Sequence, residues 1–276
     1  MDISLPVTLA VLGAALLHAT WNVLVKAGAD KELETINIAA GSGLVALLAA
    51  LFLPAPARAS WPWVAGSALV HILYFVFLAG AYRWGELSYT YPLMRGGGPM
   101  IVALVGALAL GEVLPLHETL GVLLICVGIF AFASGRHDRR ATGFALANAV
   151  VIAAYTLIDG QGARASGAPA SYTMWFFTAN GVVILGYGLA RRGGAVGVYW
   201  RGHWKRAIVG GACAVGAYGI ALWAMTRAPI AVVAVLRETA VIFGAFIAYF
   251  VLHEKLTRRR LAATGAVMLG LVALKL

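Results

Sequence analysis

The chain has 276 residues, of which 62% are hydrophobic and only 12% are charged, with a net charge of +10 and a mean hydropathy of +0.87. A soluble domain carries about twice this share of charged residues, so the composition excludes a water-soluble enzyme and a disordered chain. The 33 glycines follow no period of three, which excludes a collagen-like chain. The composition therefore indicates an integral membrane protein.

Long apolar runs, separated by charged or turn-forming residues, follow one another along the whole chain. A spanning helix needs about 20 mostly apolar residues, and these runs are continuous rather than alternating, which favours helices over a β-barrel. We predict ten transmembrane helices, near residues 5–25, 36–53, 63–83, 88–110, 116–134, 142–160, 171–190, 205–226, 229–252 and 260–276. The first run lacks a preceding basic segment, so we interpret it as a retained helix rather than a signal peptide.

Basic residues gather in the loops of one face. If the two termini share a side, the loops facing away from them hold Lys26, Lys31, Arg83, Arg136, Arg139, Arg140, Arg191, Arg192, Arg201, Lys205, Arg206, Lys255, Arg258, Arg259 and Arg260. The terminal side holds only Arg58, Arg164, Arg227 and Lys275. We predict that the protein lies in a bacterial-type inner (plasma) membrane. Because cytoplasmic loops are enriched in Lys and Arg, we also predict that both termini lie outside the cytoplasm. The net charge then reflects orientation and contact with anionic lipid, and no nucleic-acid partner is expected.

The second half of the chain repeats the first. A shift of 142 positions superimposes Arg237 on Arg95, Glu254 on Glu112 and Gly270 on Gly128. Residues 1–138 and 139–276 then hold five predicted helices each, and an odd number turns the second copy upside down in the membrane. We therefore predict an all-α membrane protein with ten transmembrane helices, arranged as two inverted five-helix repeats within one integral membrane domain.

Short motifs recur at matching places in the two halves. The first helix carries His18-Ala19-Thr20-Trp21-Asn22, followed by Lys26. The fourth helix of each half ends in Gly111-Glu112-Val113-Leu114 or in His253-Glu254-Lys255-Leu256, and the fifth helices contain Gly121, Gly128, Gly265 and Gly270. In their order and duplication these motifs resemble the EamA branch of the drug/metabolite transporter superfamily. The resemblance implies a ten-helix transporter with a central cavity and alternating access, which moves small metabolites and often exports amino acids.

A few ionisable residues lie inside the apolar runs, where each is costly unless it faces protein or water. They are His18, His71, Arg95, Asp159, Arg237 and Glu238. The rise of a helix places Arg95 and Arg237 roughly 10 to 12 Å inside the membrane from opposite faces, so the two guanidiniums would bracket the midplane. There they could bind a carboxylate or phosphate, which arginine holds in a bidentate manner. The alternative is that each arginine is a structural strut, bound to helix-end carbonyls or to Glu238.

Glu238 has three interpretations: an ion-pair partner of Arg237, a receptor for a substrate ammonium group, or a proton carrier. His18, His71 and Asp159 are further candidates for proton coupling, because histidine titrates near neutral pH. A single histidine within the membrane is also commonly a packing residue. Asp159 lies near a predicted helix end, so a boundary position stays open for it.

The segment Gly96-Gly97-Gly98-Pro99 directly follows Arg95. Three glycines and a proline weaken a helix, and such an interruption is typical of a transporter binding site, so we predict a hinge here. The alternative is that the glycines permit close packing of a neighbouring helix. Tyr91 shares a helix face with Arg95 and is its expected polar neighbour.

Aromatic and polar residues of other helices are candidates for the wall of the cavity. Those that we assign to substrate binding, together with Arg95, Arg237, Glu238 and Tyr91, are Trp21, Asn22, His18, Tyr155 and Trp175. Aromatic residues at such positions are also typical of core packing and of the membrane interface.

Enzyme chemistry finds little support in these residues. Asp159 is the one aspartate inside an apolar run, and no oxyanion-hole motif accompanies Ser42 and His71. Cys126 and Cys213 lie in separate helices, so we expect no disulfide. The sequence has no cluster of metal-ligating residues, and we expect neither a metal nor a cofactor. A nucleotide-binding loop is missing too, which favours transport driven by a gradient.

We therefore predict a secondary transporter, with export as the expected direction, for a small anionic or zwitterionic metabolite such as an amino acid. Its partners would be this substrate, the lipid bilayer and, as candidate coupling ions, protons; the chain would be a monomer or a homodimer. The alternative is an exporter of a drug or cationic metabolite with the same fold and Glu238 as its key site. A channel-like or structural membrane protein is a more remote alternative.

Overall fold

The computed structural model describes residues 3–133, 138–252 and 258–274, and these residues form helices and no strands. The elements are α1 (Leu5–Ala27), α2 (Lys31–Ala50), η1 (Arg58–Ser60), α3 (Trp61–Trp84), α4 (Leu87–Ala109), α5 (Leu116–Ala131), α6 (Arg139–Ala165), α7 (Pro169–Arg192), α8 (Ala195–Met225), α9 (Ile230–Arg237), α10 (Ala240–Leu252) and α11 (Arg258–Ala273). By length and composition, seven helical segments of this part of the chain are able to cross a membrane: α1, α2, η1 with α3, α4, α6, α7 and α8. Two shorter apolar helices, α5 and α11, accompany them.

Local sequence signals explain where several helices begin. The Asp30 side chain accepts a hydrogen bond from the backbone N–H of Leu33 and so caps α2. Asp138 caps α6 in the same way, by accepting from the N–H groups of Arg140 and Ala141. Proline lies in the first turn of α1, α3 and α7, where its missing N–H is not needed by the helix.

The structure corrects the predicted boundaries in three places. The ninth run, predicted as one helix near 229–252, is two helices that are separated at Glu238 and Thr239. There the Thr239 hydroxyl donates to the Leu236 carbonyl at 2.7 Å, and both residues form tight i to i−3 backbone bonds that end α9. Helix α2 begins at Lys31 rather than near 36. In α8, a further helical segment from Ala195 to a kink at His203 precedes the helix that was predicted from near 205.

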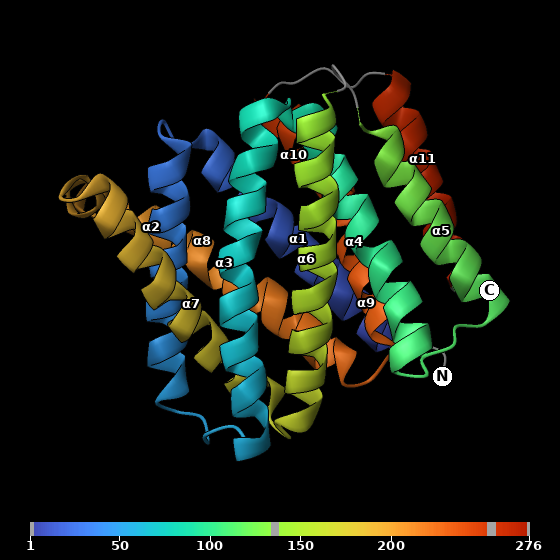
Figure 1. Cartoon of the computed structure of the whole chain (residues 1–276), viewed down its shortest axis with the longest axis horizontal. Helices are drawn as coiled ribbons and strands as arrows, with labels where there is room; N and C mark the ends of the chain where they lie inside the picture. The colour runs from blue at the N-terminus through green and yellow to red at the C-terminus, as the bar shows by residue number, and fades with distance from the viewer. Residues whose placement is uncertain (1–2, 134–137, 253–257, 275–276) are drawn as a thin grey trace.

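The helices run up and down through the molecule, so that successive connections alternate between two faces. Figure 1 shows the α1–α2, α3–α4 and α7–α8 connections at its upper side, and the α2–α3 and α6–α7 connections at its lower side. Extensive contacts join α2 to α7 and α8, α1 to α8, and α6 to α3 and α4, while α5 pairs with α11 at the right of the picture.

Small residues allow the closest of these contacts. A Cβ atom added at Gly41 on α2 would overlap the backbone of Ala207 on α8, so the two helices touch at their main chains. On the far side of the molecule, the motif glycine Gly121 of α5 lies against Gly270 of α11. Helix α9 lies inside the core, since its residues from Ile230 to Leu236 are all buried.

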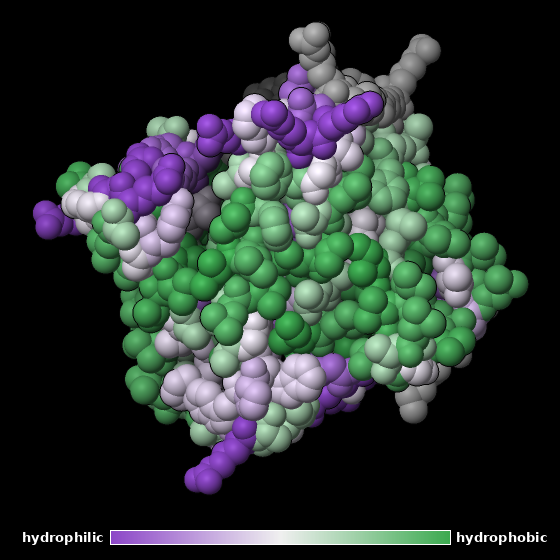
Figure 2. Space-filling view, in the orientation of Figure 1, coloured by the Kyte–Doolittle hydropathy of each residue, from purple (hydrophilic) through white to green (hydrophobic). Residues whose placement is uncertain are grey.

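The outer surface is apolar in a broad band between two polar rims. Figure 2 shows this band in green, with hydrophilic residues in purple at the top and upper left and a smaller group at the bottom. Leu69, Leu108 and Val127 are among the large apolar side chains that it exposes. Such a surface would be unstable in water and is suited to the hydrocarbon of a bilayer.

Some sequence predictions fall on residues outside the described ranges. They are the His253-Glu254-Lys255-Leu256 motif, Arg136 and Lys275.

Candidate functional site

A buried ion pair joins the two halves of the chain near the middle of the bundle. Nε of Arg95 on α4 donates to Oε2 of Glu238 at 2.8 Å, and the two residues are only 8% and 4% exposed. Glu238 lies at the break between α9 and α10, so the break places its carboxylate against α4. An ion pair was one of the interpretations that the sequence left open for Glu238, and in the structure its partner is Arg95 rather than the adjacent Arg237.

The contact leaves part of both groups unused. Within the described residues, Arg95 has no other hydrogen bond, so its two terminal nitrogens remain free. Oε1 of Glu238 likewise makes no hydrogen bond there. The four N–H donors of these terminal nitrogens and one oxygen of the adjacent carboxylate are thus available to a ligand.

Arg237, the second arginine of the predicted pair, has a different environment. Its guanidinium carbon lies 4.9 Å from the centre of the Tyr218 ring, a cation–π contact with α8. Over residues 3–133, 138–252 and 258–274, no carboxylate forms an ion pair with it and no acceptor hydrogen-bonds to it. A guanidinium at this depth retains five donors that an anionic ligand could satisfy.

Tyrosines and a histidine surround the two arginines. Tyr74, Tyr91 and Tyr155 lie within electrostatic reach of Arg95, and Tyr155 also of Arg237. His18 on α1 is within the same reach of both arginines. The structure therefore brings residues from α1, α3, α4, α6 and the α9–α10 break to one place, as a shared binding site requires.

Two further residues of the first-helix motif, Trp21 and Asn22, lie beside His18. The Trp21 ring packs edge-on against the His18 ring with centroids 5.2 Å apart, and the Asn22 amide donates to the His18 carbonyl at 2.7 Å. Asn22 thus uses one of the two N–H donors of its amide within its own helix. Trp175, in contrast, lies apart from the arginines, because it is 36% exposed and packs against Trp61 at 5.0 Å.

A second buried acid lies on α6. Asp159 is fully buried and accepts hydrogen bonds from the hydroxyl of Tyr172 at 2.8 Å and from that of Tyr218 at 2.5 Å. It does not take the boundary position that the sequence left open. His71 of α3 lies within electrostatic reach of Asp159 and packs on Tyr155, with ring centroids 4.4 Å apart.

The glycine segment after Arg95 lies inside an unbroken helix. Helix α4 continues through Gly96, Gly97, Gly98 and Pro99, although Pro92 and Pro99 both lie within it. A Cβ atom at Gly98 would lie 2.7 Å from Cγ2 of Ile152 on α6, and one at Gly96 would meet Phe130 of α5. The glycines therefore serve close helix packing in this structure. A hinge at this segment stays a prediction.

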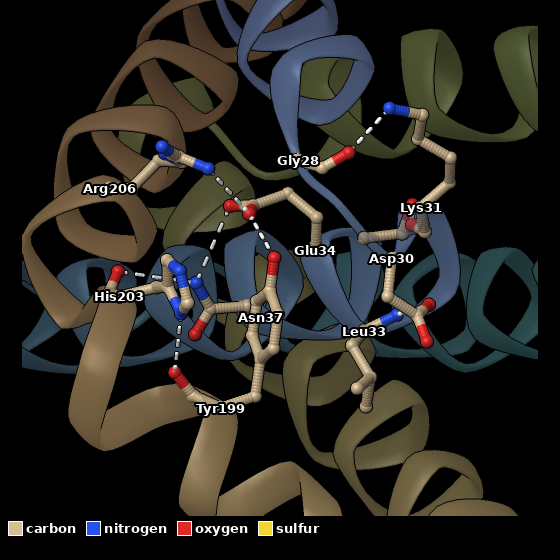
Figure 3. Close-up of polar contacts among 10 residues, drawn as sticks. Gly28, Asp30, Lys31, Leu33, Glu34, Asn37, Tyr199, His203 and Arg206 are labelled. Carbon is tan, nitrogen blue, oxygen red and sulfur yellow. Dashed lines mark hydrogen bonds and ion pairs between the residues drawn. The ribbon is translucent and has the colours of Figure 1, made fainter.

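A polar network closes the face that carries the basic loops. Figure 3 shows Glu34 of α2, which is fully buried, between Arg206 and Tyr199 of α8. Its Oε2 accepts from the Tyr199 hydroxyl at 2.6 Å and from Arg206 at 3.1 Å. Asn37 donates to the carbonyl of His203, where α8 is kinked. The network thus fastens α2 to the kink of α8.

The start of α2 is also bound to the end of α7. Arg192 contacts the carboxylates of both Asp30 and Glu32. The hydrogen bond from the Leu33 backbone N–H, with Arg192 beside the carboxylate, lowers the pKa of Asp30 below its ordinary value. These contacts hold the α1–α2 and α7–α8 connections together on one face.

The opposite face has its own ion pair between the halves. Glu112, in the connection before α5, accepts from Arg164 of α6 at 2.5 Å and from the backbone N–H of Ile230 at 2.9 Å. Arg164 also donates to the carbonyls of Met225 and Ala228. Glu112 thus caps α9 and keeps Arg164 in place, which is a structural role.

Sequence reasoning missed several residues that the structure brings into these clusters. They are Tyr172, Ser67 and Glu34. Tyr172 follows Asp159 by 13 positions and meets it across the α6–α7 turn, a contact for which the sequence holds no signal. Glu34 lay in a segment interpreted as a charged loop, so its burial could not be anticipated.

No group of three or more His, Cys, Asp or Glu side chains in the described part of the chain could hold a metal ion. The site therefore consists of two arginines, two carboxylates, two histidines and several tyrosines, which are groups that bind small polar solutes and protons.

Comparisons with known proteins agree with this architecture. The chain is similar to a protein known from a crystal structure, with a TM-score of 0.75 over 98% of both chains at 20% sequence identity, a likeness that shows the fold. No curated protein matches the chain. The model of the EamA-like transporter family matches residues 140–276. The chain therefore belongs to the EamA-like transporter family of helical, multi-pass membrane proteins.

Proposed function

We propose that the chain is a gradient-driven carrier of a small anionic or zwitterionic metabolite such as an amino acid, with export as its direction. The observation that carries the proposal is Arg237, whose guanidinium has no carboxylate partner among the described residues and which lies in an apolar run that the sequence predicts to cross the membrane. A permanent charge in such a place requires compensation, and a substrate carboxylate supplies it.

The remaining groups of the site complement an amino acid. The free terminal nitrogens of Arg95 would share the carboxylate with Arg237, while Oε1 of Glu238 would accept from the substrate ammonium group. The ion pair with Arg95 keeps Glu238 oriented for this contact. A cationic drug would have to compete with Arg95 for Glu238, so the pair disfavours the alternative of a cation exporter.

Alternating access is part of the proposal and rests on an inverted repeat of residues 1–138 and 139–276. Helix packing supports the repeat, because α1 packs on α8 as its equivalent α6 packs on α3. Two further pairs, α2 with α7 and α5 with α11, join equivalent helices of the two halves. The face that carries Asp30, Arg192 and Arg206 would point to the cytoplasm, since the basic residues gather there.

Counterflow in proteoliposomes tests the arginine site. We expect Arg237→Gln and Arg95→Gln each to lower the transport efficiency for an amino acid by roughly ten- to a hundredfold, the loss of a hydrogen bond between charged groups. A matched control is Arg227→Gln, because Arg227 also lies 4.9 Å from an aromatic ring, that of Trp223, but is exposed. The control should transport like the wild type.

The counterflow assay would test three kinds of compound as competitors: amino acids, the corresponding 2-oxo acids and the corresponding amines. Carboxylate-bearing compounds should compete for transport and the amines should not. Unchanged transport of an anionic substrate by both arginine variants would overturn the proposed site, and flux without saturation or counterflow would indicate a channel instead.

A further inference from the structure

One tyrosine contacts both a buried acid and the unpaired arginine. The Tyr218 hydroxyl donates to Oδ2 of Asp159 at 2.5 Å, while the face of its ring lies 4.9 Å from the Arg237 guanidinium. Tyr218 is 8% exposed and Asp159 is fully buried, so water screens their hydrogen bond little, whereas the Arg237 side chain is partly exposed. Asp159 of α6 and Arg237 of α9 are thus linked through a single side chain of α8.

The two contacts of Tyr218 strengthen each other. An ionised carboxylate that accepts from the hydroxyl enriches the ring in electron density, and an electron-rich ring attracts a guanidinium more strongly. When a proton neutralises the carboxylate, the ring loses this enrichment and its attraction for Arg237 weakens. Because coupling between two binding events is reciprocal, a substrate anion that draws Arg237 away also changes how strongly Asp159 holds a proton.

The surroundings of Asp159 contain few other groups that could take over this role. Tyr172 of α7 donates to its second oxygen, and His71 and Ser67 face it from α3. His71 is itself bound through Nδ1 to the Ser67 carbonyl at 2.8 Å. On its own helix the nearby titratable group is Tyr155.

The charged groups of the remaining helices lie further along the site. Arg95 of α4 is bound to Glu238, and Arg237 of α9 meets Asp159 through the Tyr218 ring.

We propose that Asp159 binds the proton that couples substrate transport to the pH gradient, and that Tyr218 is the positioning residue that transmits this protonation to Arg237. The inference rests on the proposed function, since it assigns the coupling ion of the same site. A proton adds to the Asp159 carboxylate on one side of the membrane and leaves for water on the other; no other bond forms or breaks. Protonation releases Arg237 for the substrate carboxylate, and substrate release returns Arg237 to the ring.

Two phenylalanine variants separate coupling from mere support of Asp159. Tyr218→Phe and Tyr172→Phe each remove one hydroxyl from the same carboxylate, but only Tyr218 contacts Arg237. In proteoliposomes we would measure, for each variant, the ratio of accumulation driven by a pH gradient to counterflow at equal pH. The ratio is independent of the amount of folded protein in the membrane.

We expect Tyr218→Phe to lower this ratio by at least about tenfold, as the loss of a hydrogen bond to a charged group does, and Tyr172→Phe to lower it clearly less. Asp159→Asn should abolish accumulation driven by the pH gradient and leave counterflow independent of pH. Tyr187→Phe, which alters an exposed tyrosine of α7, serves as the control with an unchanged ratio.

Equal ratios for Tyr218→Phe and Tyr172→Phe would overturn the role of Tyr218. Accumulation driven by a pH gradient in Asp159→Asn would overturn the proton site. This test does not depend on whether the tyrosine variants fold. A wild-type protein that transports no carboxylate-bearing compound would refute the proposed function, and the inference with it. That outcome is distinct, because it is seen in the wild type before any variant is compared.

Discussion

The ion pair of Arg95 and Glu238 combines one residue from each half of the chain at a place where both are buried. Removing two charges from water costs free energy that their attraction repays only in part, so such a pair is weak evidence of stabilisation. What the pair does provide is orientation. It leaves the free nitrogens of Arg95 and the free oxygen of Glu238 side by side, which an apolar pair could not do.

The buried pair should respond asymmetrically to substitution. Glu238→Ala leaves Arg95 as a buried, uncompensated charge, so we expect a loss of about 3 to 5 kcal/mol in the free energy of unfolding. The double variant Arg95→Met with Glu238→Met removes both charges and should recover most of this loss, yet transport should be absent. Chemical unfolding in mixed detergent micelles measures both.

An exposed ion pair provides the comparison. Arg191 and Glu32 lie 3.1 Å apart with side chains 64% and 34% exposed, and Arg191→Ala should change stability by about 0 to 1 kcal/mol.

For the buried pair, one outcome would contradict the prediction. If the double variant Arg95→Met with Glu238→Met were as unstable as Glu238→Ala, the loss would come from packing rather than from an unpaired charge.

At the scale of elements, the two helices that carry the arginines are built differently from what their sequences suggest. Helix α4 contains three successive glycines and two prolines and still runs unbroken from Leu87 to Ala109. The segment that the shift of 142 positions matches to it has Glu238, Thr239 and Ala240 in place of the three glycines, and it is interrupted at Glu238 and Thr239. Neighbouring side chains that fill the space beside the glycines stabilise α4, whereas a hydroxyl that binds the Leu236 carbonyl ends α9.

Gly98 distinguishes packing from a hinge. A Cβ atom there would lie 2.7 Å from Cγ2 of Ile152, so Gly98→Ala should destabilise the protein by steric overlap. Ile152→Ala opens a cavity of its own, but it removes the overlapping atom. We therefore expect the double variant to be more stable than the sum of the single effects by about 0.5 to 3 kcal/mol, in the same unfolding assay.

A hinge would give another pattern. Gly98→Ala would then reduce transport with little effect on stability, and Ile152→Ala would not compensate. Gly143→Ala on α6 is a control, since a Cβ atom there meets nothing within 4 Å.

The apolar runs predicted the order of the helices because hydrocarbon demands continuous apolar segments, and charge at membrane depth predicted Arg95, Arg237, Glu238 and Asp159 as the site. Where helices extend past the hydrocarbon this signal ends, so the polar start of α8 resembled a loop. Contacts between distant helices, such as that of Tyr172 with Asp159, depend on how helices cross. No single-sequence pattern encodes them.

At the scale of the whole molecule, the connections sort by charge. Those at the upper side of Figure 1 contain the contacts of Arg192 and Arg206, whereas the lower side holds Arg58 and Arg164. Each side is closed by polar contacts between the halves, through Glu34 on one and Glu112 on the other. Alternating access would require these two networks to open in turn, since the central site lies between them.

The orientation in the membrane is the last prediction. In a background in which Ala replaces Cys126 and Cys213, a single cysteine is introduced at Ala59 or at Gly194, both of which are exposed and lie on opposite faces. Basic loops remain in the cytoplasm, so an impermeant maleimide should label Ala59→Cys in intact cells and Gly194→Cys only after permeabilisation. The reverse pattern would mean that the basic face points outward, and labelling of both in intact cells would mean that the chain inserts in two orientations. With the reverse pattern, the two networks would face the opposite solutions, and Asp159 would take up its proton from the other side. With both orientations present, proton uptake would have no single direction.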